Sequence, residues 1–152
     1  MIAPGLAQFL EEGLSIHVGT RNDRLEPNGV RAAAVRVDPA GTHVEVYVAE
    51  AAAARVLRDL EANGQIAISL CRPVDDKACQ VKGRFVSVRP AEADDRAVVT
   101  AQWDRFVGGL ELIGIPRAAT ARWPTWPAVA IRLAVTALFE QTPAAGTGGP
   151  LA

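Results

Sequence analysis

Two arginines within an apolar stretch are the residues of this sequence best suited to binding a charged ligand. The hexapeptide from Arg31 to Arg36 reads Arg-Ala-Ala-Ala-Val-Arg and lies in a run that we expect to form a β-strand. A guanidinium group can donate two parallel hydrogen bonds to one phosphate. The small side chains of Ala32, Ala33 and Ala34 would let a flat group approach the backbone. These residues therefore indicate a ligand that joins an anionic group to a planar ring.

The other reactive residue types do not form a recognisable catalytic or metal-binding set. No residue stands out as a catalytic acid, base or nucleophile, so the catalytic residues stay unknown at this level. The two histidines, His17 and His43, alternate with apolar neighbours, which is typical of exposed strand residues. The two cysteines, Cys71 and Cys79, lack the CxxC spacing of a zinc site. They could face each other across neighbouring strands, but two buried thiols are the favoured interpretation in a reducing compartment.

The composition limits the class of protein. A chain of 152 residues, 49% apolar and 22% charged, is typical of one soluble globular domain. A formal net charge of -1 argues against a nucleic-acid partner, which would need a concentrated basic face. No apolar run approaches the roughly 20 residues that cross a bilayer, so no membrane contact is expected. The first residues lack a basic segment before a long apolar core, so we expect no signal peptide and a cytoplasmic protein.

Hydrophobic periodicity predicts six strands and two to three helices. The strands are expected at residues 15–20, 30–38, 42–48, 65–71, 79–89 and 129–139, and the helices at 6–12, 50–62 and 90–107. Asn28-Gly29 is a turn signal, and Gly108-Gly109 is expected to end the last helix. In the fifth strand the apolar, inward-facing residues occupy odd positions before Gly83, at Cys79 and Val81, and even positions after it, at Val86 and Val88. This change predicts a bulge or bend near Gly83.

This order of elements favours a mainly β fold. A single helix between the third and fourth strands disfavours a doubly wound parallel sheet, whereas six short strands with inserted helices favour a closed or nearly closed antiparallel barrel. We expect one domain over residues 1–141. The Pro- and Gly-rich residues 142–152 are expected to form a flexible C-terminal tail.

Several short stretches follow one another with a particular order and spacing. They are the first hairpin, Leu60-Glu-Ala-Asn63, the strand 66–70, Gln80-Val-Lys-Gly83 and Phe139-Glu-Gln-Thr-Pro143. Each is a weak motif, but over residues 6–141 they resemble the pyridoxamine 5'-phosphate oxidase-like FMN-binding split-barrel family. The resemblance implies a six-stranded antiparallel split β-barrel with two to three helices, FMN as cofactor, and a homodimer with flavins at the subunit interface.

The resemblance also implies a set of FMN contacts. Arg31 and Arg36, with Arg55 from the following helix, would bind the phosphate. The segment Ala32, Ala33 and Ala34 would run along the ring, and Gln80 would hydrogen-bond it. Strict alternation points Arg31 and Arg36 to opposite faces, so both reach one phosphate only if the strand bulges or the phosphate lies at its end.

The chain departs from the family pattern near the end of the third strand. Where the family has hydroxyl groups and an Arg-Lys pair, this sequence has Ala49, Glu50, Ala54 and Val56. Thr20, Arg21 and Lys82 are the residues that could replace those contacts. The predicted cofactor-binding set is Arg31, Ala32, Ala33, Ala34, Arg36, Arg55, Gln80 and Lys82.

Three functions follow as hypotheses. The first is an FMN-dependent oxidoreductase acting on a small-molecule redox substrate, in which the flavin performs the electron chemistry. Pyridoxamine phosphate itself is disfavoured as substrate, because the Arg- and His-rich C-terminal segment of that enzyme has no match after Phe139. The second is a non-catalytic module that binds flavin or haem, with His17 or His43 as the only imidazoles for an iron. The third is an interaction protein whose barrel has lost its cofactor.

Overall fold

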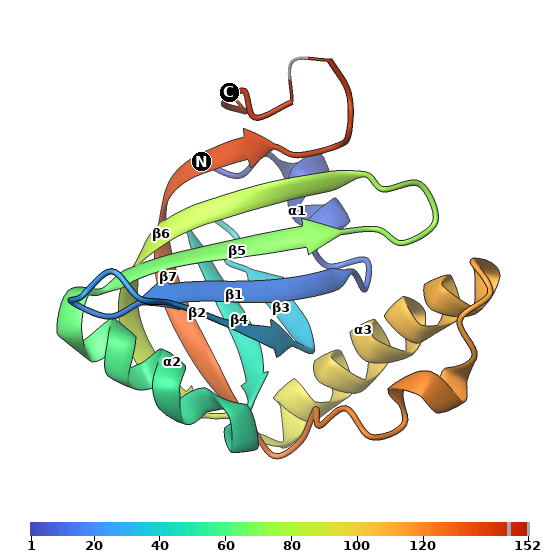
Figure 1. The fold of residues 1–152 in the computed structure, drawn as a ribbon, viewed down its shortest axis with the longest axis horizontal. Coiled ribbons are helices and arrows are strands. Elements are labelled where there is room, and N and C mark those ends of the chain that lie inside the picture. The colour runs from blue at the N-terminus through green and yellow to red at the C-terminus, as the bar shows by residue number, and fades with distance from the viewer. Residues whose placement is uncertain (146, 152) are drawn as a thin grey trace.

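The computed structural model describes residues 1–145 and 147–151 of the chain (Figure 1). Its helices are α1 (Pro4–Leu10), α2 (Glu50–Asn63) and α3 (Ala93–Leu112), followed by a short 3₁₀ helix, η1 (Arg117–Thr120). Its strands are β1 (Ser15–Arg21), β2 (Pro27–Ala32), β3 (Ala34–Val37), β4 (His43–Ala49), β5 (Gln65–Cys71), β6 (Ala78–Pro90) and β7 (Ala128–Glu140). Every paired neighbour is antiparallel.

The strand predicted at residues 30–38 is divided, so the sheet has seven strands rather than six. The sheet order is β2-β1-β5-β6-β7-β4-β3, which places β2 and β3 at opposite edges although only Ala33 separates them in the chain. The sheet must therefore curl until its edges meet, and the Ala33 N–H donates to the Tyr47 carbonyl oxygen at 2.9 Å at that junction. The predicted mainly β antiparallel barrel is confirmed, and only its strand count is corrected.

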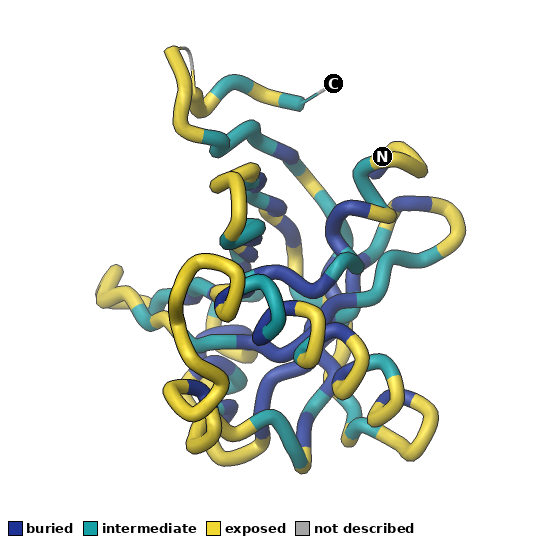
Figure 2. The backbone as a smooth tube through the Cα atoms, turned by 90° about the vertical axis from the view of Figure 1, so that its right-hand side faces the viewer, coloured by how far each residue is buried: buried dark blue, intermediate teal, exposed yellow. Residues whose placement is uncertain are grey.

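Alternate residues of the strands face an aliphatic core inside the barrel. Ile16 and Val18 of β1 and Ile68 of β5 are fully buried, as the two-residue period of a strand requires. The helix α2 packs Val56 and Leu60 against the same core. Burying one such side chain contributes about 1.5–3 kcal/mol, so this core is the main source of stability. In Figure 2 the buried segments gather at the centre, while the outer turns of the helices and the C-terminal tail are exposed.

The irregularity predicted in the fifth strand occurs at two points of β6. The register with β7 shifts between Lys82 and Gly83, as predicted, and again between Phe85 and Ser87. A Cβ atom at Gly83 would lie 2.5 Å from the Ala134 carbonyl oxygen, so the first shift brings the two backbones close together. After the second shift Val86 and Val88 are exposed, which corrects their predicted inward orientation.

The turn signal at Asn28-Gly29 was wrong. Asn28 and Gly29 lie within β2, paired with β1, and the turn is at residues 22–26 instead. There the Asn22 side chain accepts hydrogen bonds from the backbone N–H groups of Arg24 and Glu26, so an Asx-type turn forms earlier in the chain.

The pair Gly108-Gly109 lies inside α3, which continues to Leu112. A helical glycine costs only about 1 kcal/mol relative to alanine. Burial of Phe106, Val107 and Leu110 in one cluster offsets that cost, so tertiary packing overrides the local signal.

The helices lie to the sides of the sheet and leave one face uncovered. In Figure 1, α3 packs beside β3 and β4, α2 lies along the ends of β1 and β2, and β1, β5 and β6 face the viewer. The described residues after β7 form no helix or strand, but Pro150 forms an isolated bridge with Phe139. Among the described residues, no helix has the length and apolar character needed to cross a membrane.

Candidate functional site

The outer face of β2, β1, β5 and β6 bears a row of small residues. Gly29 on β2 lies opposite Gly19 on β1, and Gly19 lies opposite Ala67 on β5. Beyond Ala67 the small residues end at Lys82 on β6, which lies opposite Ala137 on β7. A Cβ atom at Gly29 would meet nothing within 4 Å, and one at Gly19 would be 3.8 Å from the Ala67 carbonyl oxygen. The row therefore forms a flat floor with open space above it.

Polar side chains flank this floor on both sides. On one side Gln65 lies opposite Arg84, next to Arg21 at the end of β1. On the other side His17 lies opposite Ser69, which lies opposite Gln80. All of them point outward because their strand neighbours are in the core.

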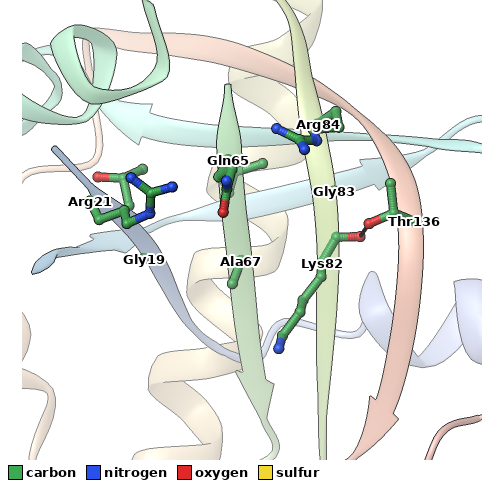
Figure 3. Close-up of a pocket in the computed structure, with 10 residues that line it drawn as sticks. Gly19, Arg21, Gln65, Ala67, Lys82, Gly83, Arg84 and Thr136 are labelled. Carbon is green, nitrogen blue, oxygen red and sulfur yellow. Dashed lines mark hydrogen bonds between the residues drawn. The ribbon is translucent and has the colours of Figure 1, made fainter. Parts of the chain in front are cut away.

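The Arg21 side of the floor opens into a hollow of about 460 Å³ (Figure 3). Its lining residues are Gly19, Thr20, Arg21, Gln65, Ile66, Ala67, Lys82, Gly83, Arg84 and Thr136. The lining includes three cations and no carboxylate. Within the described part of the chain, none of these three cations forms an ion pair. The hollow is therefore suited to an anion.

Asn63 at the end of α2 contacts the Arg21 backbone and the Arg84 side chain. Its side-chain amide donates to the Arg21 carbonyl oxygen at 2.7 Å, and its own carbonyl oxygen accepts from Arg84 Nη1 at 3.3 Å. Arg21 Nη1 donates to the Asn22 carbonyl oxygen at 3.1 Å. These contacts use a fraction of the donors on each guanidinium group, so the remaining N–H groups stay free for a ligand.

Arg31 lies at the β2 edge of the open face and already has contacts within the chain. Its guanidinium carbon is 4.3 Å from the centre of the Trp123 ring and 5.5 Å from that of Phe106. Its Nη1 donates to Ser15 Oγ at 3.2 Å. Partial burial lowers the pKa of Arg31. The cation is thus held by aromatic faces in a cation–π arrangement.

Arg36 also points outward, because the break at Ala33 changes the parity that strict alternation would impose. Its Nη1 lies 3.3 Å from Asp95 Oδ1. The Asp95 carboxylate also binds Arg89 and accepts a hydrogen bond from Tyr47 Oη at 2.9 Å. Hydrogen bonds from Arg89 above all hold the pKa of Asp95 far below its usual value. Arg31 on β2 and Arg36 on β3 therefore both point out of the barrel. They do not converge on one phosphate position, because Arg31 lies against Trp123 and Arg36 against Asp95.

The alanine segment between these arginines lies against the chain itself. Ala32 faces the barrel core, whereas Ala33 and Ala34 are buried with Val99 of α3. The Gln102 side chain of the same helix accepts from the Val35 N–H at 3.1 Å and donates to the Val35 carbonyl oxygen at 2.7 Å. The helix α3 therefore occupies the space in which a ring was expected to lie.

The remaining predicted residues fall into two places. Gln80 and Lys82 lie on the open face, with Lys82 Nζ 4.8 Å from the centre of the Phe139 ring. Arg55 lies on α2, where it donates to the Pro27 carbonyl oxygen at 3.3 Å and lines a separate hollow. The substitutes Thr20 and Arg21 line the same hollow as Lys82.

The histidine and cysteine expectations can be placed as well. His17 lies on the open face, and partial desolvation of its ring, followed by the nearby Arg31 charge, lowers its pKa. It is therefore neutral at neutral pH. Cys79 faces the core, where burial raises its pKa to about 12, whereas Cys71 faces outward. Both thiols are free, and their opposite orientations prevent a disulfide.

Sequence reasoning missed four of the residues that define this face, which are Gly19, Gln65, Ala67 and Arg84. The available signal was Gly19, because a glycine inside a strand often marks a place where a ligand or another backbone approaches closely. The other three become recognisable only once the strand register places them beside one another.

Comparisons with known proteins support the fold. No protein-family model and no curated protein matches the chain. Among solved structures, an F420 reductase aligns with a TM-score of 0.60 at 18% identity, over 90% of this chain and 98% of that one. A candidate pyridoxamine 5'-phosphate oxidase from Lactobacillus delbrueckii aligns with a TM-score of 0.55 at 12% identity, over 90% and 92% of the two chains. An FMN-binding protein from Syntrophomonas wolfei aligns with a TM-score of 0.53 at 12% identity, over 87% and 81%. The chain thus has the pyridoxamine 5'-phosphate oxidase-like split-barrel fold.

Proposed function

We propose that the chain binds FMN on its open sheet face and acts as an FMN-dependent oxidoreductase. The observation that supports this most directly is the floor of Gly29, Gly19 and Ala67, flanked by polar rows and ending in a cationic hollow. A flat ring needs a surface without projecting side chains, and its phosphate needs unpaired cations. The split-barrel neighbours include an FMN-binding protein, which agrees with this ligand.

The residues of the chain would bind and orient the flavin. Gln80 and Ser69, beside the floor, would offer hydrogen bonds to the edge of the ring, and the cations of the hollow would bind its phosphate. A bound flavin supplies hydride or single-electron transfer, while the protein contributes position and electrostatics. The substrate would be a small molecule that reaches the exposed side of the ring.

A second copy of the chain would complete the site. The floor forms only one wall, so a ring lying on it would expose its other face to water. A homodimer formed across the open face would cover that side and exclude solvent. We therefore propose that the functional unit is a homodimer. Sedimentation of the purified protein at several concentrations tests this, and a monomer that binds FMN fully would contradict it.

A haem-binding module is the second candidate. The observation that favours it is His17, an exposed imidazole on the open face whose lowered pKa keeps it neutral and able to bind iron. His43 is less suited, because it lies at the start of β4 and not on the open face of β2, β1, β5 and β6. A Soret band after addition of haem, lost in His17→Ala, would support this candidate over the flavin.

Titration of the purified protein with FMN tests the main proposal. We expect saturable binding, observed as quenching of flavin fluorescence and as protein-bound absorbance at about 450 nm, a property of the flavin itself. Anaerobic reduction of the bound flavin by NADH or NADPH would then distinguish an oxidoreductase from a binding module. A protein that remains colourless and does not bind added FMN would overturn the proposal.

A further inference from the structure

Arg21 and Arg84 come from different strands and approach the same point of the open face. Arg21 ends β1, Arg84 lies on β6, and Gln65 at the start of β5 lies between them. Figure 3 shows both guanidinium groups turned toward Gln65, whereas the Lys82 side chain extends away from them along the sheet. Within one hollow, the cations therefore divide into a pair and a separate amine.

From this division we propose that Arg21 and Arg84 bind the phosphate of the ligand, so that its ring lies over Gly19 and Ala67. The inference rests on the proposed flavin function and gives the ligand a direction on the sheet. It assigns the phosphate to arginines outside the strand from Arg31 to Arg36. The ligand class is a phosphomonoester joined to a flat ring system.

The arginine pair is held in position before any ligand arrives. Asn63 contacts both residues, through the Arg21 carbonyl oxygen at 2.7 Å and Arg84 Nη1 at 3.3 Å. A guanidinium group that is already oriented loses less conformational entropy when it binds an oxyanion. Asn63 thus orients the Arg84 guanidinium group and positions the Arg21 backbone, while the Asn22 carbonyl oxygen accepts from Arg21 Nη1 at 3.1 Å and orients that guanidinium group.

The surroundings of Arg21 and Arg84 also differ from those of Arg31 and Arg36, the arginines that the sequence predicted to bind the phosphate. Arg36 lies against the Asp95 carboxylate, and Arg31 is stacked on Trp123. Neither Arg21 nor Arg84 has a carboxylate within ion-pairing distance among residues 1–145 and 147–151. A dianionic phosphate would meet no fixed negative charge in the lining of the hollow.

The opposite end of the floor is better suited to the ring than to the phosphate. Beyond Gly19 and Ala67 the flanking row holds His17, Ser69 and Gln80, which are uncharged at neutral pH and can donate or accept hydrogen bonds. Lys82 Nζ points that way, toward the Phe139 ring. The ring would thus meet hydrogen-bonding partners at this end, where the two cations, Arg31 and the Lys82 amine, already lie against the Trp123 and Phe139 rings.

Comparing FMN with riboflavin, which has the same ring and no phosphate, isolates this contact. We would measure the affinity of the full-length protein for both flavins by fluorescence quenching, in the wild type and in Arg21→Gln and Arg84→Gln. Lys82→Gln removes one positive charge within the same hollow, and Arg122→Gln removes one from an exposed position outside it. Thermal melts followed by circular dichroism would establish that each variant folds.

We expect the wild type to bind FMN more tightly than riboflavin, by about tenfold or more, since each charge-assisted phosphate contact contributes at least that factor. Arg21→Gln and Arg84→Gln should each reduce this ratio about tenfold. Lys82→Gln should reduce it less than either arginine variant, and Arg122→Gln should leave it unchanged. If the wild type binds both flavins equally, or if the two arginine variants lose both affinities by the same factor, the phosphate assignment fails although flavin binding stands. If the wild type binds neither flavin, the proposed function and the assignment both fail.

Discussion

The arginines of this chain differ in what surrounds them rather than in their own chemistry. Arg31 and Arg36 carry the sequence pattern that suggested a phosphate site, yet each is held by residues that lie far away in the sequence, Trp123 and Asp95 respectively. Arg21 and Arg84 have no comparable pattern, but they share a hollow without a carboxylate. At this scale the availability of a cation depends on its tertiary neighbours.

Substitution of Gly19 tests the floor of the proposed site. The position is in a strand, its φ is not positive, and a Cβ there would make only an ordinary contact at 3.8 Å, so Gly19→Val should fold and keep or raise the free energy of unfolding. The valine methyl groups would project into the space of the ring, so FMN affinity should fall by about tenfold or more. Ser87→Val, at an exposed position of β6, provides the control. Unchanged FMN affinity in Gly19→Val would exclude the floor as the flavin site.

Asp95 allows a prediction about pH. Its folded-state pKa is held below the ordinary value of 3.8, mainly by Arg89, so its stabilising effect is fully present above pH 3.8 and is lost as the pH falls through the folded-state pKa. Asp95→Asn removes the carboxylate that Arg36, Arg89 and Tyr47 share. It should lower the free energy of unfolding by about 3 kcal/mol at neutral pH.

Urea denaturation of both proteins from pH 7 to pH 2 checks this prediction. The difference between wild type and Asp95→Asn should shrink as the pH falls. Asp104→Asn, at an exposed position of α3, should behave as the wild type does. A difference that stays constant with pH would show that the Asp95 charge does not stabilise the fold.

At the scale of elements, the attachment of α3 decides which part of the barrel surface is open. Gln102 pairs with both backbone polar groups of Val35, and Val99 packs on Ala33 and Ala34. In effect the Gln102 amide takes the place of a neighbouring strand at the edge of β3. The helix therefore covers the surface of β3 and leaves that of β1, β5 and β6 free.

Replacement of Gln102 should weaken this attachment. Gln102→Ala leaves the buried N–H and carbonyl groups of Val35 without partners, so the free energy of unfolding should fall by about 2–4 kcal/mol. Urea denaturation measures the loss, and Gln8→Ala, at an exposed position of α1, is the control. Amide exchange at Val35 should increase as well. A Gln102→Ala protein as stable as Gln8→Ala would contradict the role of this side chain.

For the whole molecule, the curled antiparallel sheet forms the scaffold, and the ligand is expected to bind on its outer face. Binding to the folded state alone raises stability by mass action, by about 2.7 kcal/mol when the FMN concentration is 100 times the dissociation constant. For a chain of this length the melting temperature should rise by roughly 5–10 °C. Differential scanning calorimetry with and without FMN measures the shift. Gly19→Val should show a much smaller shift, and an equal shift in that variant would place the flavin elsewhere.

The sequence by itself determined the elements and their order. Alternating apolar residues specify which side of each strand is buried, and this local pattern was enough to predict an antiparallel barrel and an irregularity near Gly83. It was not enough for the turn, where Asn22 competes with Asn28-Gly29, or for the end of α3, where burial of Leu110 outweighs the two glycines. In both places a contact that the local sequence does not specify overrides its signal.

The tertiary structure alone decided which residues share a site. Gln80, Lys82 and Arg21 were within reach of sequence reasoning because each has a chemical type that fits a phosphate or a ring. Their association with Gly19 and Arg84 depends on strand register, since residues up to 65 positions apart become neighbours only when β1, β5 and β6 pair. From the sequence, residues Ala32 to Ala34 were expected to leave space for a ring. In the folded chain α3 packs on Ala33 and Ala34 and fills that space.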